Sequence, residues 1–261
     1  MTANWSIERR LARLRGSNGK FSLLAADHGL TFGEVPGLES INDIVTTARI
    51  AAVSGVVTNY GTLQAMPADI PAGLIMQTYG GLRDATGTGI KHRLYAPSQL
   101  GHLAIDGIAI ELNLATSAES VNSRLELIAS STLEAHRIGL PVLAMLNQLG
   151  DREPAAALLA SARIAQELGA DIIKVGIDQR LGTISMNERR ELRNHIRHLP
   201  PLVLAGGPTT EDLYFKLELA ADLGFSGACV GRHLFSSHDV AQSAVRIFGT
   251  EALTDGRPSN P

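Results

Sequence analysis

The 261-residue chain has little of several things that define other classes of protein. Its single cysteine, Cys229, cannot form an internal disulfide, so nothing indicates an oxidising compartment. No apolar run approaches the roughly eighteen residues that a membrane helix needs, and the opening MTANWSIERRLARLR lacks the apolar stretch of a signal peptide. We therefore expect a soluble, cytoplasmic protein without a membrane partner.

Aromatic residues and clustered charge are also scarce. Aromatic residues make up 4% of the chain and hydrophobic residues 44%, which indicates a core of Ala, Leu, Ile and Val. The formal net charge is -3 and the basic residues are scattered, so we expect no nucleic acid partner. His195 and His198 are three residues apart, but nothing completes a metal set, and we interpret them as part of a solvated helix face. No metal and no cofactor are expected.

What the chain does contain is an alternation of short apolar runs with longer amphipathic runs, repeated eight times. This rhythm is typical of a parallel sheet whose strands are joined by helices, and the length suits one β/α barrel. We predict a single-domain (β/α)8 TIM barrel over residues 1–250 and a flexible tail over residues 251–261. The glycine-rich segment Tyr79–Pro97 is predicted to be a loop over one face of the barrel.

The element boundaries follow from the same pattern. Strands are expected at Phe21–Ala26, Gly55–Thr58, Gly73–Gln77, Gly107–Leu112, Pro141–Leu146, Asp171–Val175, Leu202–Ala205 and Gly227–Val230. The clearest helices are expected at Ile41–Val53, Ala118–Ile138, Pro154–Leu168, Asn187–His198, Thr210–Leu223 and Val240–Phe248. Gly139, Gly169 and Gly224 follow three of these helices, as is typical of helix C-termini.

Lys174 lies within the apolar strand ADIIKV, where a charged side chain is costly to bury. Both faces of this strand are otherwise apolar, so we expect desolvation to lower the pKa of the lysine. A neutral amine could then attack a carbonyl. The alternative is structural, because a lysine here could pair with a buried carboxylate or extend to the rim of the sheet.

Asp27 closes the first predicted strand in LLAADHG and is followed by His28. The active site of a β/α barrel lies at the carboxyl ends of its strands, where a carboxylate can orient an amine, move protons or bind a hydroxyl. Alternatively, Asp27 caps the next turn and His28 bonds backbone in the loop. Glu111 and Asn113, which end the fourth strand, allow the same two interpretations.

Two glycine turns, AGGP and VGR, follow the seventh and eighth predicted strands. Glycine lets backbone amides approach an anion closely, and these two loops are the usual phosphate site of a β/α barrel. We expect Gly206, Gly207, Gly231 and Arg232 to bind a substrate phosphate, with charge-assisted contacts from the arginine. The alternative is ordinary turn glycines beside a surface arginine. Cys229, in the middle of a strand, is interpreted as a small core residue.

Taken together, these segments resemble the archaeal-type class I fructose-bisphosphate aldolases, a DeoC/DhnA-like group of barrels. The similarity runs in order from LLAADHGLTFGEVPGLES to GACVGRHLFSSHD and covers most of the chain. The resemblance implies that Lys174 forms a Schiff base and that Asp27 is the first-strand carboxylate. It also implies a homo-oligomer, a phosphorylated ketone such as dihydroxyacetone phosphate as substrate, and an aldehyde as co-substrate.

One position departs from that family's pattern. Where the fructose-bisphosphate aldolases carry a tyrosine acid/base, in a segment like AMMYPRG, this chain has AMLNQLG with Asn147. An amide cannot transfer the proton, so we expect Asn147 to position substrate or water while Asp27, His28 or the substrate phosphate moves protons. We therefore predict a specialised aldolase or synthase, with a transaldolase- or thiolase-type transferase of the same family as an alternative.

Two functions of other classes stay open. A phosphosugar isomerase that uses Asp27 and Glu111 as acid and base would form no covalent intermediate, and Lys174 would then act only as a cation. A binding or scaffold protein would explain the missing tyrosine, but it would not explain why both the lysine and the carboxylate are present.

Overall fold

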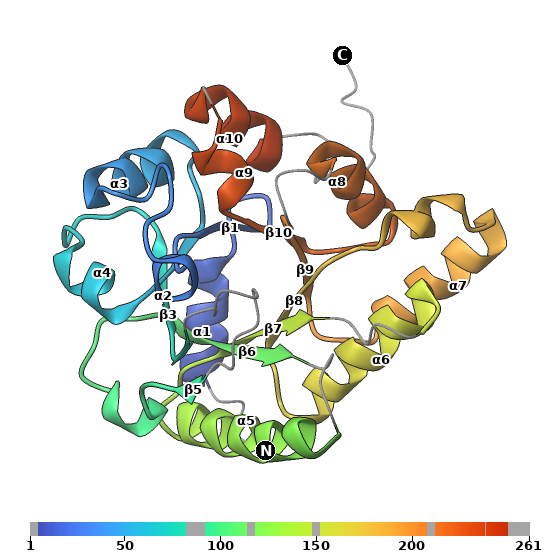
Figure 1. Cartoon of the computed structure of the whole chain (residues 1–261), viewed down its shortest axis with the longest axis horizontal. Coiled ribbons are helices and arrows are strands. Elements are labelled where there is room, and N and C mark those ends of the chain that lie inside the picture. The colour runs from blue at the N-terminus through green and yellow to red at the C-terminus, as the bar shows by residue number, and fades with distance from the viewer. Residues whose placement is uncertain are drawn as a thin grey trace.

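Eight parallel strands form a closed barrel with helices around it (Figure 1), so the predicted (β/α)8 fold is confirmed. The computed structural model describes residues 5–81, 92–113, 118–147, 152–207, 212–237 and 239–249, with side chains except at 112–113, 118–124, 147 and 240–241. The predicted tail over residues 251–261 lies outside these ranges. No helix within them has the length and apolar content that crossing a membrane requires.

The barrel strands agree with the predicted ones to within one residue at each end. They are β1 (Phe21–Ala25), β2 (Gly55–Thr58), β3 (Gly73–Gln77), β6 (Gly107–Asn113), β7 (Val142–Asn147), β8 (Ile172–Val175), β9 (Leu202–Ala205) and β10 (Gly227–Val230). Their order around the barrel is β1, β10, β9, β8, β7, β6, β3, β2. The first and last strands are therefore neighbours, and they pair from Phe21 opposite Gly227 onward.

The helices confirm most of the predicted positions but differ at several ends. They are α1 (Trp5–Leu14), α2 (Gly29–Phe32), α3 (Ile41–Ile50), α4 (Tyr60–Ala65), α5 (Ala118–Arg137), α6 (Pro154–Glu167), α7 (Met186–Ile196), α8 (Leu213–Asp222), α9 (Arg232–Phe235) and α10 (Val240–Phe248). Helix α8 does not begin at Thr210, because the Asp212 carboxylate accepts the backbone N–H groups of Tyr214 and Phe215 and caps the helix there. Gly139, Gly169 and Gly224 have φ angles of 75°, 86° and 85°, as helix-terminating glycines do.

The segment Tyr79–Pro97 is not wholly a loop, so that expectation was wrong in part. Its described ends form a small antiparallel pair, β4 (Tyr79–Gly80) with β5 (His92–Arg93). Residues 82–91 lie outside the described ranges. The Tyr79 hydroxyl lies near α5, 3.2 Å from the Ser131 Oγ and 3.3 Å from the Leu127 carbonyl oxygen. This hairpin is therefore held against the outer helical layer.

Alternation along the strands divides the core into an outer layer beneath the helices and an inner cluster inside the barrel. The inner cluster is apolar and consists of Leu14, Phe21, Leu23, Ala25, Val57, Ile75, Ala109, Leu143, Met145, Ile172, Val203 and Cys229. Leu14 comes from α1, a helix that was not predicted, and it is 1% exposed. Side chains at Gly55 and Gly73 would come within 3.1 and 2.8 Å of its Cδ2 atom. Helix α1 therefore closes the amino-terminal end of the barrel.

Candidate active site

The alternation that fills the barrel with apolar side chains also decides which polar side chains face its open end. Ala25 and Ile172 belong to the inner cluster, so the residues two positions further along each strand face the same way. At the carboxyl ends, this inner face carries polar groups on five strands or the turns that follow them: Asp27, Asn59, Gln77, Glu111 and Lys174. A row of costly polar groups at one level of an otherwise apolar interior marks this end as the functional one.

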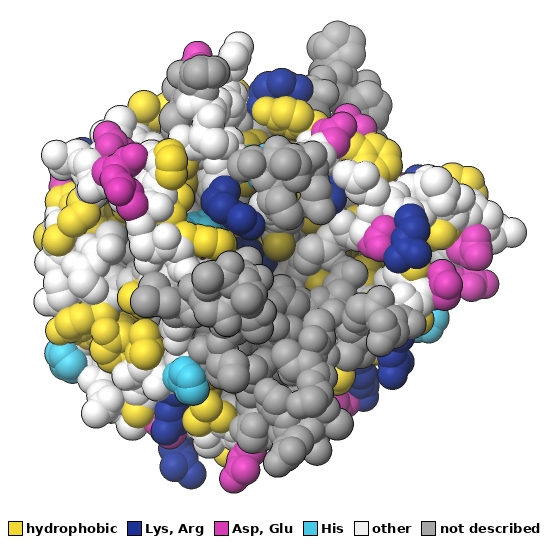
Figure 2. Space-filling view, in the orientation of Figure 1, with side chains coloured by type: hydrophobic (Ala, Val, Ile, Leu, Met, Phe, Trp, Pro, Cys, Tyr) yellow, Lys and Arg dark blue, Asp and Glu magenta, His cyan; other side chains and the backbone are white. Residues whose placement is uncertain are grey.

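A cavity of about 200 Å³ opens at the carboxyl end of the barrel. Figure 2 shows Lys and Arg side chains near the centre of this face, where the surface is hollowed and hydrophobic side chains lie beside them. The cavity draws its lining from six strands or their following turns and from α2 and α9: Ala25, Asp27, His28, Thr31, Phe32, Glu111, Met145, Leu146, Lys174, Ala205, Gly206, Gly207, Cys229, Gly231 and Arg232. Seven of the eight predicted site residues therefore meet in one cavity.

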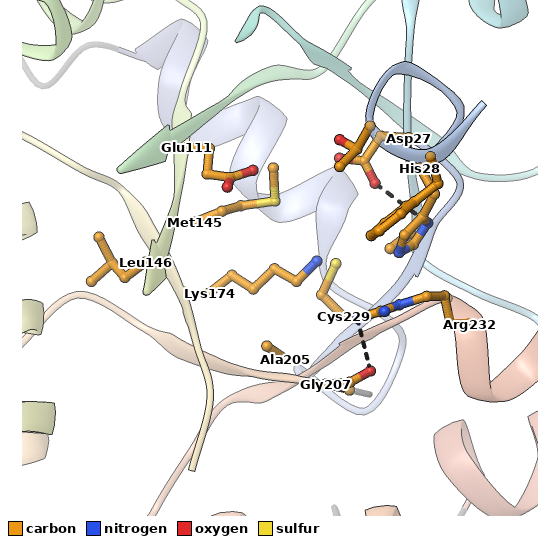
Figure 3. Close-up of a pocket in the computed structure, with 15 residues that line it drawn as sticks. Asp27, His28, Glu111, Met145, Leu146, Lys174, Ala205, Gly207, Cys229 and Arg232 are labelled. Carbon is orange, nitrogen blue, oxygen red and sulfur yellow. Dashed lines mark hydrogen bonds and ion pairs between the residues drawn. The ribbon is translucent and has the colours of Figure 1, made fainter. Parts of the chain in front are cut away.

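Lys174 extends from β8 into this cavity, with its amine directed toward Cys229 (Figure 3). In the same view, Glu111 and Asp27 lie on one side of the amine and Gly207 and Arg232 on the other. Register supports this arrangement, because Lys174 is opposite Met145 and Met145 is opposite Glu111 on three adjacent strands. The amine thus stands between an acidic wall and the two glycine turns.

The electrostatics of the cavity correct the expected state of the lysine. Burial lowers the pKa of Lys174, but the negative charges of an ionised Cys229 and of Asp27, a hydrogen bond to Cys229 and the charge of Glu111 outweigh burial and raise that pKa above its ordinary value. Burial also raises the pKa of the Cys229 thiol, while the nearby Lys174 lowers it. The resting amine is therefore an ammonium group, and the expectation of a lowered pKa was wrong because it counted desolvation alone.

Asp27 is held by neighbouring strands rather than by its own turn. Its Oδ2 accepts a hydrogen bond from Gln77 Nε2 at 3.2 Å, and its backbone oxygen accepts one from Asn59 Nδ2 at 3.0 Å. Its Oδ1 lies 3.9 Å from His28 Nδ1. The His28 ring stacks on Phe32, with 6.2 Å between ring centroids. Both predicted residues therefore line the cavity, with their side chains 11% and 16% exposed.

The two glycine turns lie side by side, and Arg232 connects them. The Arg232 guanidinium donates to the Gly207 carbonyl oxygen at 3.2 Å and lies over the Phe32 ring, 5.4 Å from its centroid. Gly207 has a φ angle of 73°, which favours glycine. A Cβ atom at Gly231 would collide with the Ala25 carbonyl oxygen of the neighbouring strand. Arg232 is half-buried and lines the cavity, and its role at a phosphate stays a prediction.

Asn147 ends β7, where it pairs with Asn113 in the neighbouring strand. Its side chain lies outside the described part of the molecule, so its role stays a prediction. Among the described residues that line the cavity there is no tyrosine. Tyr79 does not fill that place, because its hydroxyl is bonded toward α5 and burial raises its pKa.

The sequence alone did not decide whether Glu111 and Cys229 belong to the site. Glu111 lines the cavity, whereas its position at a strand end had allowed a loop-capping role equally well. Cys229 is buried as expected, at 1% exposure, but it also contacts Lys174. The available signal was alternation, since Glu111 is two residues from the inner Ala109. His195, by contrast, lies far from these residues in the chain and its Nδ1 is 3.0 Å from the Glu191 carbonyl oxygen.

Comparison with known proteins places the chain among aldolases. Residues 21–237 match the model of the DeoC/LacD family aldolases. The chain is 27% identical over 233 residues to 2-amino-3,7-dideoxy-D-threo-hept-6-ulosonate synthase 1 of Archaeoglobus fulgidus, covering 88% of this chain and 84% of that protein. It is also 27% identical over 245 residues to 3-hydroxy-5-phosphonooxypentane-2,4-dione thiolase of Salmonella typhimurium, covering 90% of this chain and 79% of that protein.

Solved structures share the fold over nearly the whole chain. An archaeal fructose-1,6-bisphosphate aldolase, with its catalytic lysine bound to the carbinolamine intermediate, superposes with a TM-score of 0.79 at 20% identity, covering 95% of this chain and 100% of that one. A Schiff-base-forming fructose-1,6-bisphosphate aldolase superposes with a TM-score of 0.78 at 21% identity, covering 92% and 98%. At these identities the likeness establishes the barrel fold.

Proposed function

Because the chain belongs to the DeoC/LacD family of aldolases, we propose that Lys174 attacks the carbonyl group of a phosphorylated ketone such as dihydroxyacetone phosphate. Family membership makes the chain an enzyme of the lyase class. The observation that carries the assignment of the nucleophile is the position of Lys174. It is a strand lysine inside the cavity, with carboxylates on one side and the paired glycine turns on the other.

The chemistry follows from the surroundings of the amine. An ammonium group must first lose a proton, and the carboxylates of Asp27 and Glu111 are the bases that face it. The neutral amine then adds to the ketone, the carboxyl group returns its proton to the departing hydroxyl group, and loss of water gives an iminium ion. This ion accepts the electron pair of a neighbouring carbon–carbon or carbon–hydrogen bond as that bond breaks. Without a tyrosine in the described lining, Asp27 takes the released proton and later returns it.

The other side of the cavity suits a phosphate group. Gly206, Gly207 and Gly231 present backbone there with no side chain in the way, and Arg232 supplies a guanidinium group. The loops after the last two barrel strands and a short extra helix form the common phosphate site of this fold, and α9 is such a helix. We therefore place the substrate phosphate beside Arg232 and its carbonyl carbon near Lys174.

The overall reaction is proposed to be specialised rather than glycolytic. The relatives named above are a synthase and a thiolase, and Asn147 stands where the fructose-bisphosphate aldolases have their tyrosine. An aldehyde acceptor completes the reaction in the synthetic direction. We also propose a cytoplasmic location, which suits the unpaired and buried Cys229, and a homo-oligomeric state, which rests on the family resemblance.

Borohydride trapping tests the nucleophile directly. The chain has only four lysines, Lys20, Lys91, Lys174 and Lys216, so a reduced adduct can be assigned by peptide mass spectrometry. With dihydroxyacetone phosphate we expect the adduct on the Lys174 peptide and an unchanged yield in a Lys20→Met control. Because the pKa of Lys174 is raised, the initial trapping rate should increase with pH above neutrality. Absence of an adduct across phosphorylated ketones would favour the isomerase.

A further inference from the structure

We propose that Gln77 is a positioning residue for Asp27, one that holds a chosen oxygen of this carboxylate as a hydrogen-bond acceptor. The inference rests on the proposed role of Asp27 in proton transfer. Gln77 ends β3 on the inner face of the barrel, two residues beyond the inner Ile75. It is 2% exposed. A buried amide is costly unless both of its ends have partners, so its contacts are informative.

The orientation of the Gln77 amide follows from one backbone group. Its Oε1 lies 3.2 Å from the Tyr79 backbone nitrogen, and an N–H group can only donate. The oxygen end therefore faces Tyr79, and the NH2 end must face Asp27 Oδ2, which lies 3.2 Å from Nε2. Because an NH2 group is only a donor, Oδ2 must accept. Any proton that Asp27 carries is then directed to Oδ1.

With this amide orientation, the two carboxylate oxygens of Asp27 have different roles. Oδ2 is engaged by a fixed neutral donor, whereas Oδ1 is on the side of His28, at 3.9 Å from Nδ1. Asn59 donates to the backbone oxygen of the same residue at 3.0 Å and steadies the main chain. A carboxylate that moves protons during a reaction must keep one oxygen aimed at the reacting atoms. Gln77 supplies that constraint from a strand that carries none of the predicted catalytic residues.

Gln77 is also suited to the charges around Asp27. The groups that face Asp27 or share its cavity are His28, Lys174, Cys229, Glu111 and Arg232, from five different elements. A neutral donor favours the ionised form of Asp27 without adding a further cation beside the Lys174 ammonium. A carboxylate at position 77 would instead compete with Asp27 for a proton, as two adjacent acids do.

The test uses Gln77→Glu in the full-length enzyme. Glutamate still accepts the Tyr79 N–H, so the hairpin stays anchored, but an ionised glutamate has no proton to donate to Asp27. We expect kcat at neutral pH to fall at least about tenfold, and the acidic limb of the kcat/KM profile to move up by about one pH unit. The KM for the ketone should change little, because the glycine turns are untouched. Gln64→Glu, an exposed position on α4, is the matched control and should behave as wild type.

A second measurement needs no turnover. In protein labelled with 13C at the aspartate carboxyl carbons, the Asp27 signal is the one lost in Asp27→Asn. Its titration midpoint should rise in Gln77→Glu and in Gln77→Leu, and stay unchanged in Gln64→Glu. Unchanged midpoints, or an unchanged acidic limb in a trapping-competent Gln77→Glu enzyme, would overturn the positioning role. A shifted midpoint in a protein that never captures a ketone would support Gln77 while refuting the Schiff-base proposal.

Discussion

The two ends of the barrel are built from the same eight strands and the same inner face, yet they differ in almost every chemical property. At the amino-terminal end, Leu14 and Phe21 are 1% and 0% exposed, and α1 lies across the strands. Arg10 anchors that helix through the carbonyl oxygens of Ile105 and Gly139, at 3.3 and 3.1 Å. At the carboxyl end, the inner face carries carboxylates, an amide and the Lys174 ammonium around a cavity.

The glycines at the two ends of the barrel have different roles. At the closed end, Gly55 and Gly73 make room for an apolar side chain, Leu14. At the open end, Gly231 makes room for the backbone of β1, and with Gly206 and Gly207 it keeps side chains away from the proposed phosphate. The same residue type stabilises the fold at one end and shapes the site at the other. Substitutions should therefore divide cleanly into those that affect stability and those that affect catalysis.

The largest effect should come from Lys174→Met at the open end. Loss of the nucleophile is expected to reduce kcat by at least about a thousandfold and to abolish borohydride trapping. The free energy of unfolding should change much less than in a core truncation, because methionine fills similar space. Turnover assays and urea unfolding measure the two effects. A modest loss of activity would instead support the isomerase, in which Lys174 is only a cation.

The second-largest effect should come from Leu14→Ala at the closed end. Unlike Lys174→Met, it should reduce stability and leave catalysis nearly unchanged. Truncating this buried side chain is expected to lower the free energy of unfolding by about 2–5 kcal/mol. Both kcat and KM should stay within about twofold of wild type, because Leu14 lies against Gly55 and Gly73 at the end of the barrel opposite the cavity. Leu133→Ala, at an α5 position with 60% exposure, is the matched control and should cost less than about 0.5 kcal/mol. A large rise in KM would show that the two ends are not independent.

The smallest effect should come from Arg232→Gln. Removing the guanidinium is expected to raise KM for the phosphorylated ketone about tenfold to a hundredfold, while trapping at saturating ketone still occurs. Arg163→Gln on α6, where the arginine side chain is 65% exposed, serves as the control. Steady-state kinetics with a ketone and its phosphate ester gives the comparison. Equal effects on both substrates would contradict a phosphate site beside Arg232.

The barrel was predictable because its strands are short, apolar and bounded by glycine, so that pattern alone located all eight. Helix α1 was missed although WSIERRLARL is amphipathic, because its role depends on contacts of Leu14 with glycines on distant strands. The start of α8 was misplaced because a cap depends on which carboxylate reaches the backbone, here Asp212. The local sequence pattern thus located the strands, whereas long-range contacts determine which helix closes the end of the barrel.

Seven of the eight predicted residues line one cavity, but the electrostatics of that cavity could not be predicted from the sequence. Lys174, Asp27 and the glycine turns stand out because lysine in an apolar strand and paired glycines are unusual. The raised pKa of Lys174 could not be foreseen, because it depends on Cys229, Asp27 and Glu111, which come from three other strands or turns. Gln77 was not singled out, although the same alternation places it on the inner face, two residues beyond Ile75. A polar residue at a strand end is common, and only its two partners distinguish it.

The pairing of the first and last strands has a consequence for protein synthesis. Asp27 leaves the ribosome 204 residues before Gly231 (231 - 27), which abuts the carbonyl oxygen of Ala25. Until β10 inserts between β1 and β9, the proposed phosphate-binding turns have no partner and the ring of strands is open. A nascent chain that lacks β10 therefore cannot assemble the proposed phosphate site.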